Sequence, residues 1–373
     1  MTGLYIHVPF CTKKCHYCNF VIALAAPAEN HRVFLDALEK EMQRHGQGFS
    51  DTAFDTVYIG GGTPSVLTAD EFERLLHFLR KQFRWKEGAE ITCEVNPGDI
   101  DAGKATLMKR LGINRVSLGA QSFHDETLRR LNRTHDAAEI ERSFRALRDA
   151  GFHNINLDLI LSLPGEPWEK ARFSLERLAG LDPEHVSLYE LTVEDKTVFG
   201  ELQRKGRLEL PSEEEQFELL ANARAFLKEH GWRHYELLNY AKSGFESRHN
   251  LLYWANEDTL GLGPGAYSHL KGRRYRFSDS YQQYLAKITS DDWNVAEEET
   301  LGGEKKEVES FLLALRLTEG VSKERFPAVV RRFDEELRDL AEKGLMTEEG
   351  GRLRLSARGQ FFAETVFAEL SSY

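Results

Sequence analysis

The chain has 373 residues, with 60 acidic and 49 basic side chains and a formal net charge of −11. This balance argues against broad, nonspecific binding to nucleic acid, and no apolar run reaches the roughly 18 residues that a membrane-spanning helix needs. The first ten residues, MTGLYIHVPF, lack the basic and apolar segments of a signal peptide, so we expect a cytoplasmic protein.

Short apolar runs alternate with longer amphipathic runs through the first half of the chain. The β-branched runs predict strands at residues 4–8, 56–60, 90–95, 115–119, 154–161 and 185–191. The runs between them predict helices at residues 31–45, 68–83, 102–111, 137–150 and 168–178. Such alternation indicates an α/β fold with a parallel sheet covered by helices. The pattern fits both an open doubly wound sheet and a curved partial barrel.

The pattern changes near residue 210. Residues 213–230 predict one long helix, and an aromatic, loop-rich stretch follows to residue 254. The last part predicts helices at 305–318, 326–333 and 335–343, a turn-rich strand pair at 345–355 and a final helix at 357–370, an order that resembles a winged helix. Residues 304–369 hold 14 acidic and 12 basic side chains, a poor footprint for DNA, so we expect a scaffold or docking module. The predicted domains are 1–210, 211–302 and 303–373.

Three of the four cysteines, Cys11, Cys15 and Cys18, fall within eight residues. A disulfide framework needs an even, distributed set of cysteines. Structural zinc takes four ligands, usually in two pairs, and no second pair follows here. Thiolates also hold iron–sulfur clusters, and three of them leave one iron of a [4Fe–4S] cluster open to a chelating small molecule. Zinc remains the alternative to a cluster at these three cysteines. The fourth cysteine, Cys93, lies in a strand-like run and is expected to be a buried core residue.

The residues around the three cysteines form a longer motif. Residues 5–20, YIHVPFCTKKCHYCNF, closely resemble the cluster loop of radical S-adenosyl-L-methionine (SAM) proteins. The flanking Y-x-H-x-P-F narrows the resemblance to the branch that contains oxygen-independent coproporphyrinogen III oxidases (dehydrogenases) and heme chaperones. The resemblance implies a partial (β/α)6 barrel with a C-terminal helical, winged-helix-like domain, a [4Fe–4S] cluster on the three cysteines, and SAM beside it. It also implies cofactor contacts from Tyr5, Tyr17 and Phe20.

A second motif, GGGTPS, follows the second predicted strand at residues 60–65. Glycines let a backbone approach a ligand closely and leave N–H groups free to bind it. Alone, the motif could be a tight turn before a helix; beside the cysteine loop it resembles the glycine motif that holds the amino acid end of SAM. The resemblance also places SAM contacts at polar residues in or after later strands, where the loops of a βα barrel converge. The full set is Gly61, Gly62, Thr63, Glu94, Gln121, Arg133 and Asp158.

A third motif, RHNLLYW, spans residues 248–254. A histidine can ligate heme iron and aromatic rings can stack on a porphyrin, although a lone histidine is more often a core or surface residue. The string H-N-x-x-Y-W resembles the motif of the heme chaperones in this branch, so we expect His249 to bind heme. Residues 261–268, GLGPGAYS, are shared by the branch and by themselves predict a rigid turn beside a sheet edge.

Two features separate chaperone from enzyme. The coproporphyrinogen enzymes carry a fourth cysteine two positions after the third ligand, where this chain has Phe20, and an N-terminal extension ahead of a cluster loop that here begins at Cys11. The resemblance therefore favours a non-enzymatic heme chaperone that binds heme and transfers it to an acceptor protein, including a membrane-associated one, without binding nucleic acid. The alternatives are a radical SAM coproporphyrinogen III dehydrogenase and a structural metalloprotein. The oligomeric state stays open.

Overall fold

The computed structural model describes residues 1–24 and 28–371. All six predicted strands of the first half are confirmed, and neighbouring strands in this set pair in parallel. They are β1 (Thr2–Val8), β4 (Ala53–Gly61), β5 (Arg84–Val95), β6 (Arg115–Gln121), β7 (Ile155–Leu161) and β8 (His185–Glu190).

The helices between these strands are also confirmed. They are α1 (Ala28–Gly46), α2 (Ala69–Gln82), α3 (Ala102–Arg110), α5 (Ala137–Asp149) and α6 (Trp168–Leu181), together with α4 (Asp125–Arg130), which was not predicted. Local chemistry starts two of them, because Thr68 and Asp136 form capping boxes with Glu71 and Glu139. Gly151, with φ of +86°, follows the C-cap residue of α5 in the left-handed conformation that favours glycine after a helix.

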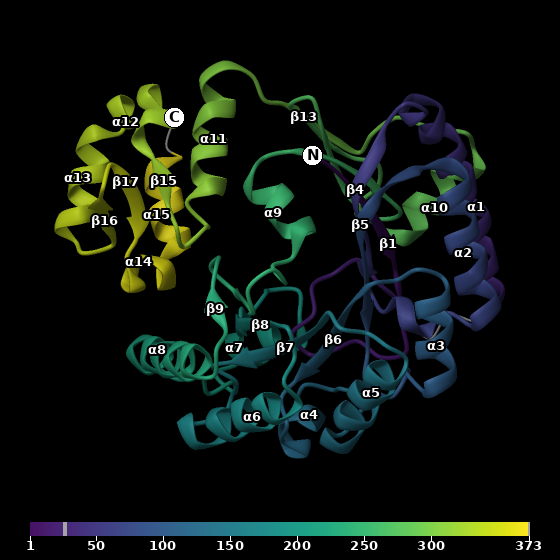
Figure 1. Cartoon of the computed structure of the whole chain (residues 1–373), viewed down its shortest axis with the longest axis horizontal. Coiled ribbons are helices and arrows are strands. Elements are labelled where there is room, and N and C mark those ends of the chain that lie inside the picture. Colours follow the sequence, from purple (N-terminus) through teal and green to yellow (C-terminus); the bar gives the residue numbers. More distant parts are fainter. Residues whose placement is uncertain (25–27, 372–373) are drawn as a thin grey trace.

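The rest of the sheet comes from the second half of the chain. Its strands are β9 (Arg233–His234), β10 (Asn239–Ala241), β11 (Asp258–Leu262), β12 (Tyr267–Leu270), β13 (Arg273–Arg276) and β14 (Glu297–Thr300). The order is β14-β13-β12-β11-β1-β4-β5-β6-β7-β8-β10-β9. Because β14 and β9 end the order unpaired with each other, the sheet is a partial barrel and not a closed one. Figure 1 shows its helices as an outer layer around the curved strands.

One expectation for the second half needs correction. The turn expected in residues 261–268 is present at residues 263–266, between β11 and β12. It does not lie beside a sheet edge, because Gly261 and Leu262 belong to β11, which pairs in parallel with β1 inside the sheet. Close packing explains the glycines. The carbonyl of Tyr267 fills the space where a side chain at Gly261 would start, and Gly263 has φ of +95°.

The remaining helices are α7 (Val198–Arg204), α8 (Glu213–Glu229), α9 (Arg248–Trp254) and α10 (Tyr281–Thr289). Figure 1 shows α9 on the concave side of the sheet, between the strands and the C-terminal helices.

The C-terminal region has a hydrophobic core of its own, formed around Val308, Phe311 and Leu340. Its elements are α11 (Gly303–Ala314), β15 (Val321–Ser322), α12 (Pro327–Arg332), α13 (Asp334–Glu342), β16 (Met346–Glu349), β17 (Arg352–Leu355), α14 (Ala357–Phe361) and α15 (Ala363–Leu370). The expected single final helix is therefore wrong in detail, since it breaks at Phe362. The domain boundaries stay predictions, because strands from residues 211–302 extend the main sheet.

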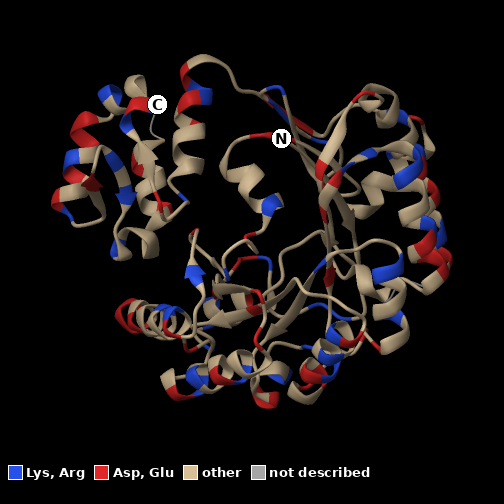
Figure 2. Cartoon of the chain, in the orientation of Figure 1, with Lys and Arg blue, Asp and Glu red and all other residues tan. Residues whose placement is uncertain are grey.

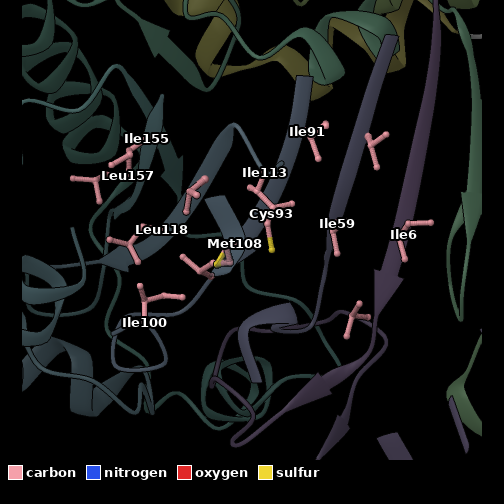
Figure 3. Close-up of a cluster of buried hydrophobic side chains, with 14 of the residues drawn as sticks. Ile6, Ile59, Ile91, Cys93, Ile100, Met108, Ile113, Leu118, Ile155 and Leu157 are labelled. Atoms are coloured by element: carbon pink, nitrogen blue, oxygen red, sulfur yellow. The ribbon is translucent and has the colours of Figure 1, made fainter. Parts of the chain in front are cut away.

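The strands separate an apolar layer from a polar interior. Alternate residues of a strand point to opposite faces. Figure 3 shows Ile91 and Cys93 of β5 in the apolar cluster with Ile59 and Met108, and Cys93 is fully buried, as predicted for a core residue. The intervening Thr92 and Glu94 therefore face the concave interior of the barrel, which we call the lumen.

Charged side chains are distributed without a dominant sign. Figure 2 shows basic and acidic positions mixed over the outer helices and the C-terminal region. Among the described helices, none is long and apolar enough to cross a membrane.

Candidate functional site

A pocket of about 520 Å³ lies where the loops after the parallel strands converge. It brings together most of the predicted site residues from six separate stretches of sequence. Those that line it are Cys11, Cys15, Tyr17, Cys18, Phe20, Gly61, Gly62, Thr63, Glu94, Gln121, Arg133 and Asp158. Tyr5 and His249 do not line it.

The cysteine loop is folded back on itself. The short strand β2 (Phe10–Cys11) pairs with β3 (Ala23–Leu24), and the amide of Cys18 donates to the carbonyl of Cys15 at 3.2 Å. His16 is tied away from the sulfurs, since its Nδ1 lies 2.8 Å from the Arg130 carbonyl. The three cysteines are partly exposed toward the pocket.

The arrangement of these thiols fits a cluster better than zinc. Within residues 1–24 and 28–371, no three His, Cys, Asp or Glu side chains gather closely enough to hold one metal ion. A [4Fe–4S] cluster needs no such convergence, because each thiolate binds a different iron. Burial raises the pKa of Cys11 to about 11, so a bound cationic centre is needed to keep that sulfur deprotonated.

The glycine motif packs directly against the cysteine loop. The amides of Gly62 and Thr63 donate to the carbonyls of Val8 and Phe10, both at 2.8 Å, and Thr63 Oγ1 lies 3.4 Å from Cys11 Sγ. A Cβ on Gly62 would lie 2.7 Å from the Phe10 carbonyl oxygen. The glycines are therefore required for loop-to-loop contact as well as for space beside a ligand.

Glu94 is a half-buried carboxyl at the pocket wall. Its oxygens accept from the Tyr58 hydroxyl at 2.8 Å and from the Gly61 amide at 3.0 Å. Burial raises its pKa to about 7, an effect that the Tyr58 hydrogen bond partly offsets. A cationic amine that binds beside this carboxyl would lower its pKa and favour the negatively charged form.

Arg133 joins the cysteine loop to the sheet. Its Nη1 lies 3.4 Å from Cys15 Sγ, and its Nη2 donates to the Asn96 side chain at 2.5 Å and to the Gly119 carbonyl at 2.8 Å. A guanidinium in contact with a thiolate offsets the negative charge that such ligands carry. Its buried Nε has no partner among the described residues.

Gln121 and Asp158 complete the far wall. Gln121 has φ of +68°, a left-handed conformation that non-glycine residues adopt mainly where surrounding structure enforces it. Asp158 accepts from Asn156 Nδ2 at 2.6 Å, and burial raises its pKa. Both side chains can offer oxygen acceptors to a ligand in the pocket.

His249, the expected heme ligand, lies outside the pocket and is buried. Its Nδ1 lies 2.7 Å from Thr56 Oγ1 and its Nε2 lies 3.0 Å from the Tyr253 hydroxyl, so neither ring nitrogen is free. A Cβ on Gly3 would lie 3.2 Å from its ring, which places His249 at the amino end of β1, roughly 16 Å along the strand from Val8 beside the glycine motif. Burial lowers its pKa to about 3. Heme ligation by His249 stays a prediction that requires Tyr253 to release Nε2.

Tyr5 also points into the lumen, with its hydroxyl 3.1 Å from His7 Nδ1. Among the pocket residues that sequence reasoning missed are Asn96, Ser117 and Tyr189. Ser117 could have been found from the sequence. Arg115, Ser117 and Gly119 are every second residue of a predicted strand, so their side chains lie on the same face, which turns to the lumen.

Comparisons with known proteins agree with this architecture. Residues 5–178 match the family model of the radical SAM superfamily, and residues 306–362 match that of the HemN C-terminal domain. The heme chaperone HemW of Bacillus subtilis is 36% identical over 98% of both chains, and that of Lactococcus lactis is 34% identical over 97% of this chain and 95% of its own. Among solved structures, the coproporphyrinogen III oxidase HemN of Escherichia coli, a radical SAM enzyme, superposes with a TM-score of 0.87 at 25% identity, over 100% of this chain and 90% of its own. The chain belongs to the HemW heme chaperone family of the radical SAM superfamily.

Proposed function

We propose that this protein holds a [4Fe–4S] cluster and SAM in its pocket, binds heme, and transfers that heme to an acceptor protein in the cytoplasm. The observation that carries the proposal is the meeting of the three cysteines, the glycine motif, Glu94 and Arg133 around one pocket, in a chain of a family named for heme chaperones. When bound, cluster and SAM together supply one-electron chemistry.

Each residue has a defined part in holding the cofactors. Cys11, Cys15 and Cys18 are the cluster ligands, and Arg133 supplies positive charge beside Cys15. Glu94 is suited to the ammonium group of SAM, because it is a half-buried carboxyl with two donors that keep it oriented. Tyr17 and Phe20 add aromatic surface at the pocket wall.

Heme binding is tested with anaerobically reconstituted protein. We expect about one heme per chain in a Soret titration, and transfer of that heme to apomyoglobin as a probe acceptor. Failure of the intact, cluster-loaded protein to bind heme would end the chaperone proposal.

A second function has one specific observation in its favour. The match to the HemN enzyme extends over the whole chain, with a TM-score of 0.87, so a porphyrinogen-oxidising radical SAM enzyme is the alternative. Phe20 in place of the enzyme's extra cysteine weighs against it. Robust conversion of coproporphyrinogen III to protoporphyrinogen IX, with cleavage of SAM, would replace the chaperone proposal by this one.

A further inference from the structure

A buried cation without a partner lies in the lumen. Arg115, the first residue of β6, is 2% exposed. Its side chain forms no hydrogen bond to any residue that the structure describes, its Nε is buried without an acceptor, and no described carboxylate oxygen lies within 4.0 Å of its guanidinium. Burial of an uncompensated charge is strongly unfavourable, so this arginine needs an explanation.

A second orphan donor lies directly beside it. Thr92 of β5 is the cross-strand partner of Arg115, is fully buried, and has a hydroxyl without a partner. Because Ile91 and Cys93 point to the outer core in Figure 3, Thr92 points to the lumen. Two adjacent strands thus present hydrogen-bond donors to the same space.

The surrounding groups do not supply the missing acceptor. Near Arg115 are two histidines whose ring nitrogens are occupied: His185 lies between Asn156 Oδ1 at 2.7 Å and the Tyr235 hydroxyl at 2.8 Å, and His249 is held as described above. Burial raises the pKa of Glu94 and Asp158, and the charge of Arg115 only partly offsets this. Neither carboxyl lies within 4.0 Å of the Arg115 guanidinium. A third carboxylate, Glu90, lies two residues before Thr92 on the same face of β5, and its two oxygens accept from the amides of Arg248 and His249.

The orphan donors lie directly under the pocket. Ser117, two residues farther along β6 and about 7 Å away, is on the same face of the strand and lines the pocket together with Glu94 and Asp158. A ligand that fills the pocket can therefore extend a narrow arm between these walls toward Arg115.

We infer that Arg115 and Thr92 form a carboxylate-binding site at the floor of the pocket. A planar guanidinium binds a carboxylate through two parallel hydrogen bonds, and the threonine hydroxyl can donate a third. A monoanion balances one buried guanidinium, whereas a dianion would leave excess negative charge beside Glu94 and Asp158. The carboxylate is either a small free acid or the propionate arm of a tetrapyrrole; the second source rests on the proposed heme binding, and the first does not.

The first test uses the full chain with its cluster reconstituted. Propionate should raise the Tm of the wild-type protein in a concentration-dependent way, because a ligand that binds only the folded state stabilises it. Neutral propionamide, at matched ionic strength, should not. Arg115→Met should remove the propionate effect and Thr92→Val should weaken it. Equal responses to acid and amide, or no response in the wild-type protein, would overturn the inference without any variant having to fold.

The competing explanation is a water molecule that bridges Arg115, Thr92 and the unpartnered Oδ1 of Asn154. If Arg115 awaits a ligand, Arg115→Met should raise the Tm in carboxylate-free buffer by about 2 °C or more, since methionine fills similar volume without a charge. A lowered Tm together with no response to propionate in the wild-type protein would identify Arg115 as a structural residue and refute the site.

Heme binding distinguishes a tetrapyrrole propionate from a small free acid as the carboxylate that binds Arg115. If a propionate arm reaches Arg115, wild-type protein should bind heme roughly tenfold or more tightly than heme dimethyl ester, and Arg115→Met should bind both equally. Equal binding by the wild-type protein, together with a Tm shift by propionate, assigns the site to a small free carboxylate. If heme does not bind at all, the proposed function fails while the propionate result still decides the site.

Discussion

The two ends of the lumen each contain an arginine, half-buried at the mouth and buried at the floor, and the two arginines differ in what surrounds them. At the mouth, Arg133 contacts Cys15 Sγ, the Asn96 side chain and the Gly119 carbonyl. At the floor, Arg115 has no hydrogen-bond partner in the described chain. The mouth thus gives its arginine hydrogen-bond acceptors from the protein, whereas at the floor only a ligand or solvent can accept hydrogen bonds from the guanidinium.

The ends also differ in construction. The mouth is built from loops, with partly exposed cysteines. The floor is closed by α9, whose first amides, from Arg248 and His249, donate to the two oxygens of the buried Glu90 at 3.0 Å each. A carboxylate at a helix N-terminus stabilises that end of the helix, so α9 is fixed in the lumen. We therefore expect cofactor chemistry at the mouth, which is built from loops, and ligand anchoring at the floor, which α9 closes.

The largest effect should come from the mouth. Cys15→Ala should lose the iron–sulfur cluster completely, because the remaining two thiolates hold the cluster too weakly. Anaerobic reconstitution should give about four irons and a broad visible band in the intact protein and neither in the variant. Cys93→Ala, which changes a core cysteine, is the matched control and should keep both. Stoichiometric zinc without cluster in the intact protein would contradict the cluster assignment.

Removal of Glu94 should weaken SAM binding without loss of the cluster. Because a charged hydrogen bond to a cationic amine contributes about 1.5–3 kcal/mol, Glu94→Ala should reduce affinity by roughly tenfold to hundredfold in calorimetry. Glu41→Gln is the control, since Glu41 is a buried carboxyl that also has a pKa of about 7 but is held by Tyr284 and Gly263 outside the pocket. Unchanged affinity in Glu94→Ala would remove this residue from the site.

Substitution of His249 tests whether the floor of the lumen also binds heme iron. His249→Ala should lower the free energy of unfolding by about 2–4 kcal/mol, because it leaves a cavity and orphans Thr56 and Tyr253. If His249 ligates heme, this variant should also lose its normal Soret band, while Tyr253→Phe should tighten heme binding by releasing Nε2. A normal heme spectrum in His249→Ala would move the iron ligand elsewhere, with His7 the next residue to change.

The smallest effect is a dependence on pH. Since burial raises the pKa of Glu94 to about 7 from a usual 4.5, its carboxylate form prevails only above that pH. SAM affinity should therefore rise by up to about tenfold between pH 6 and 8, and Glu94→Gln should flatten the profile. In the SAM-free protein the sign is reversed: the folded state holds the extra proton, so the stability due to Glu94 falls as pH rises from 4.5 through 7. An identical pH profile in Glu94→Gln would show that another group titrates.

The sequence by itself determined the local features of this protein. The spacing of Cys11, Cys15 and Cys18, the glycine motif after β4 and the alternation of strands and helices each depend on residues close together in the chain, and each was recovered. The resemblance of residues 5–20 added the cofactors, since spacing alone left zinc open. Cys93 was predicted correctly because alternation along a single strand sets which face it occupies.

Tertiary structure decided what depends on distant partners. Pairing of β11 with β1 joins segments about 250 residues apart in sequence, as Thr2 pairs with Asp258, and no local pattern encodes that choice. The motif around His249 was recognised, yet packing of α9 into the lumen occupied both ring nitrogens of its histidine. Arg115 reads in the sequence as one more residue at the start of a strand. Its missing partner emerges only when the neighbouring strands are in place, because a charge is compensated or left uncompensated by the atoms that the fold brings around it.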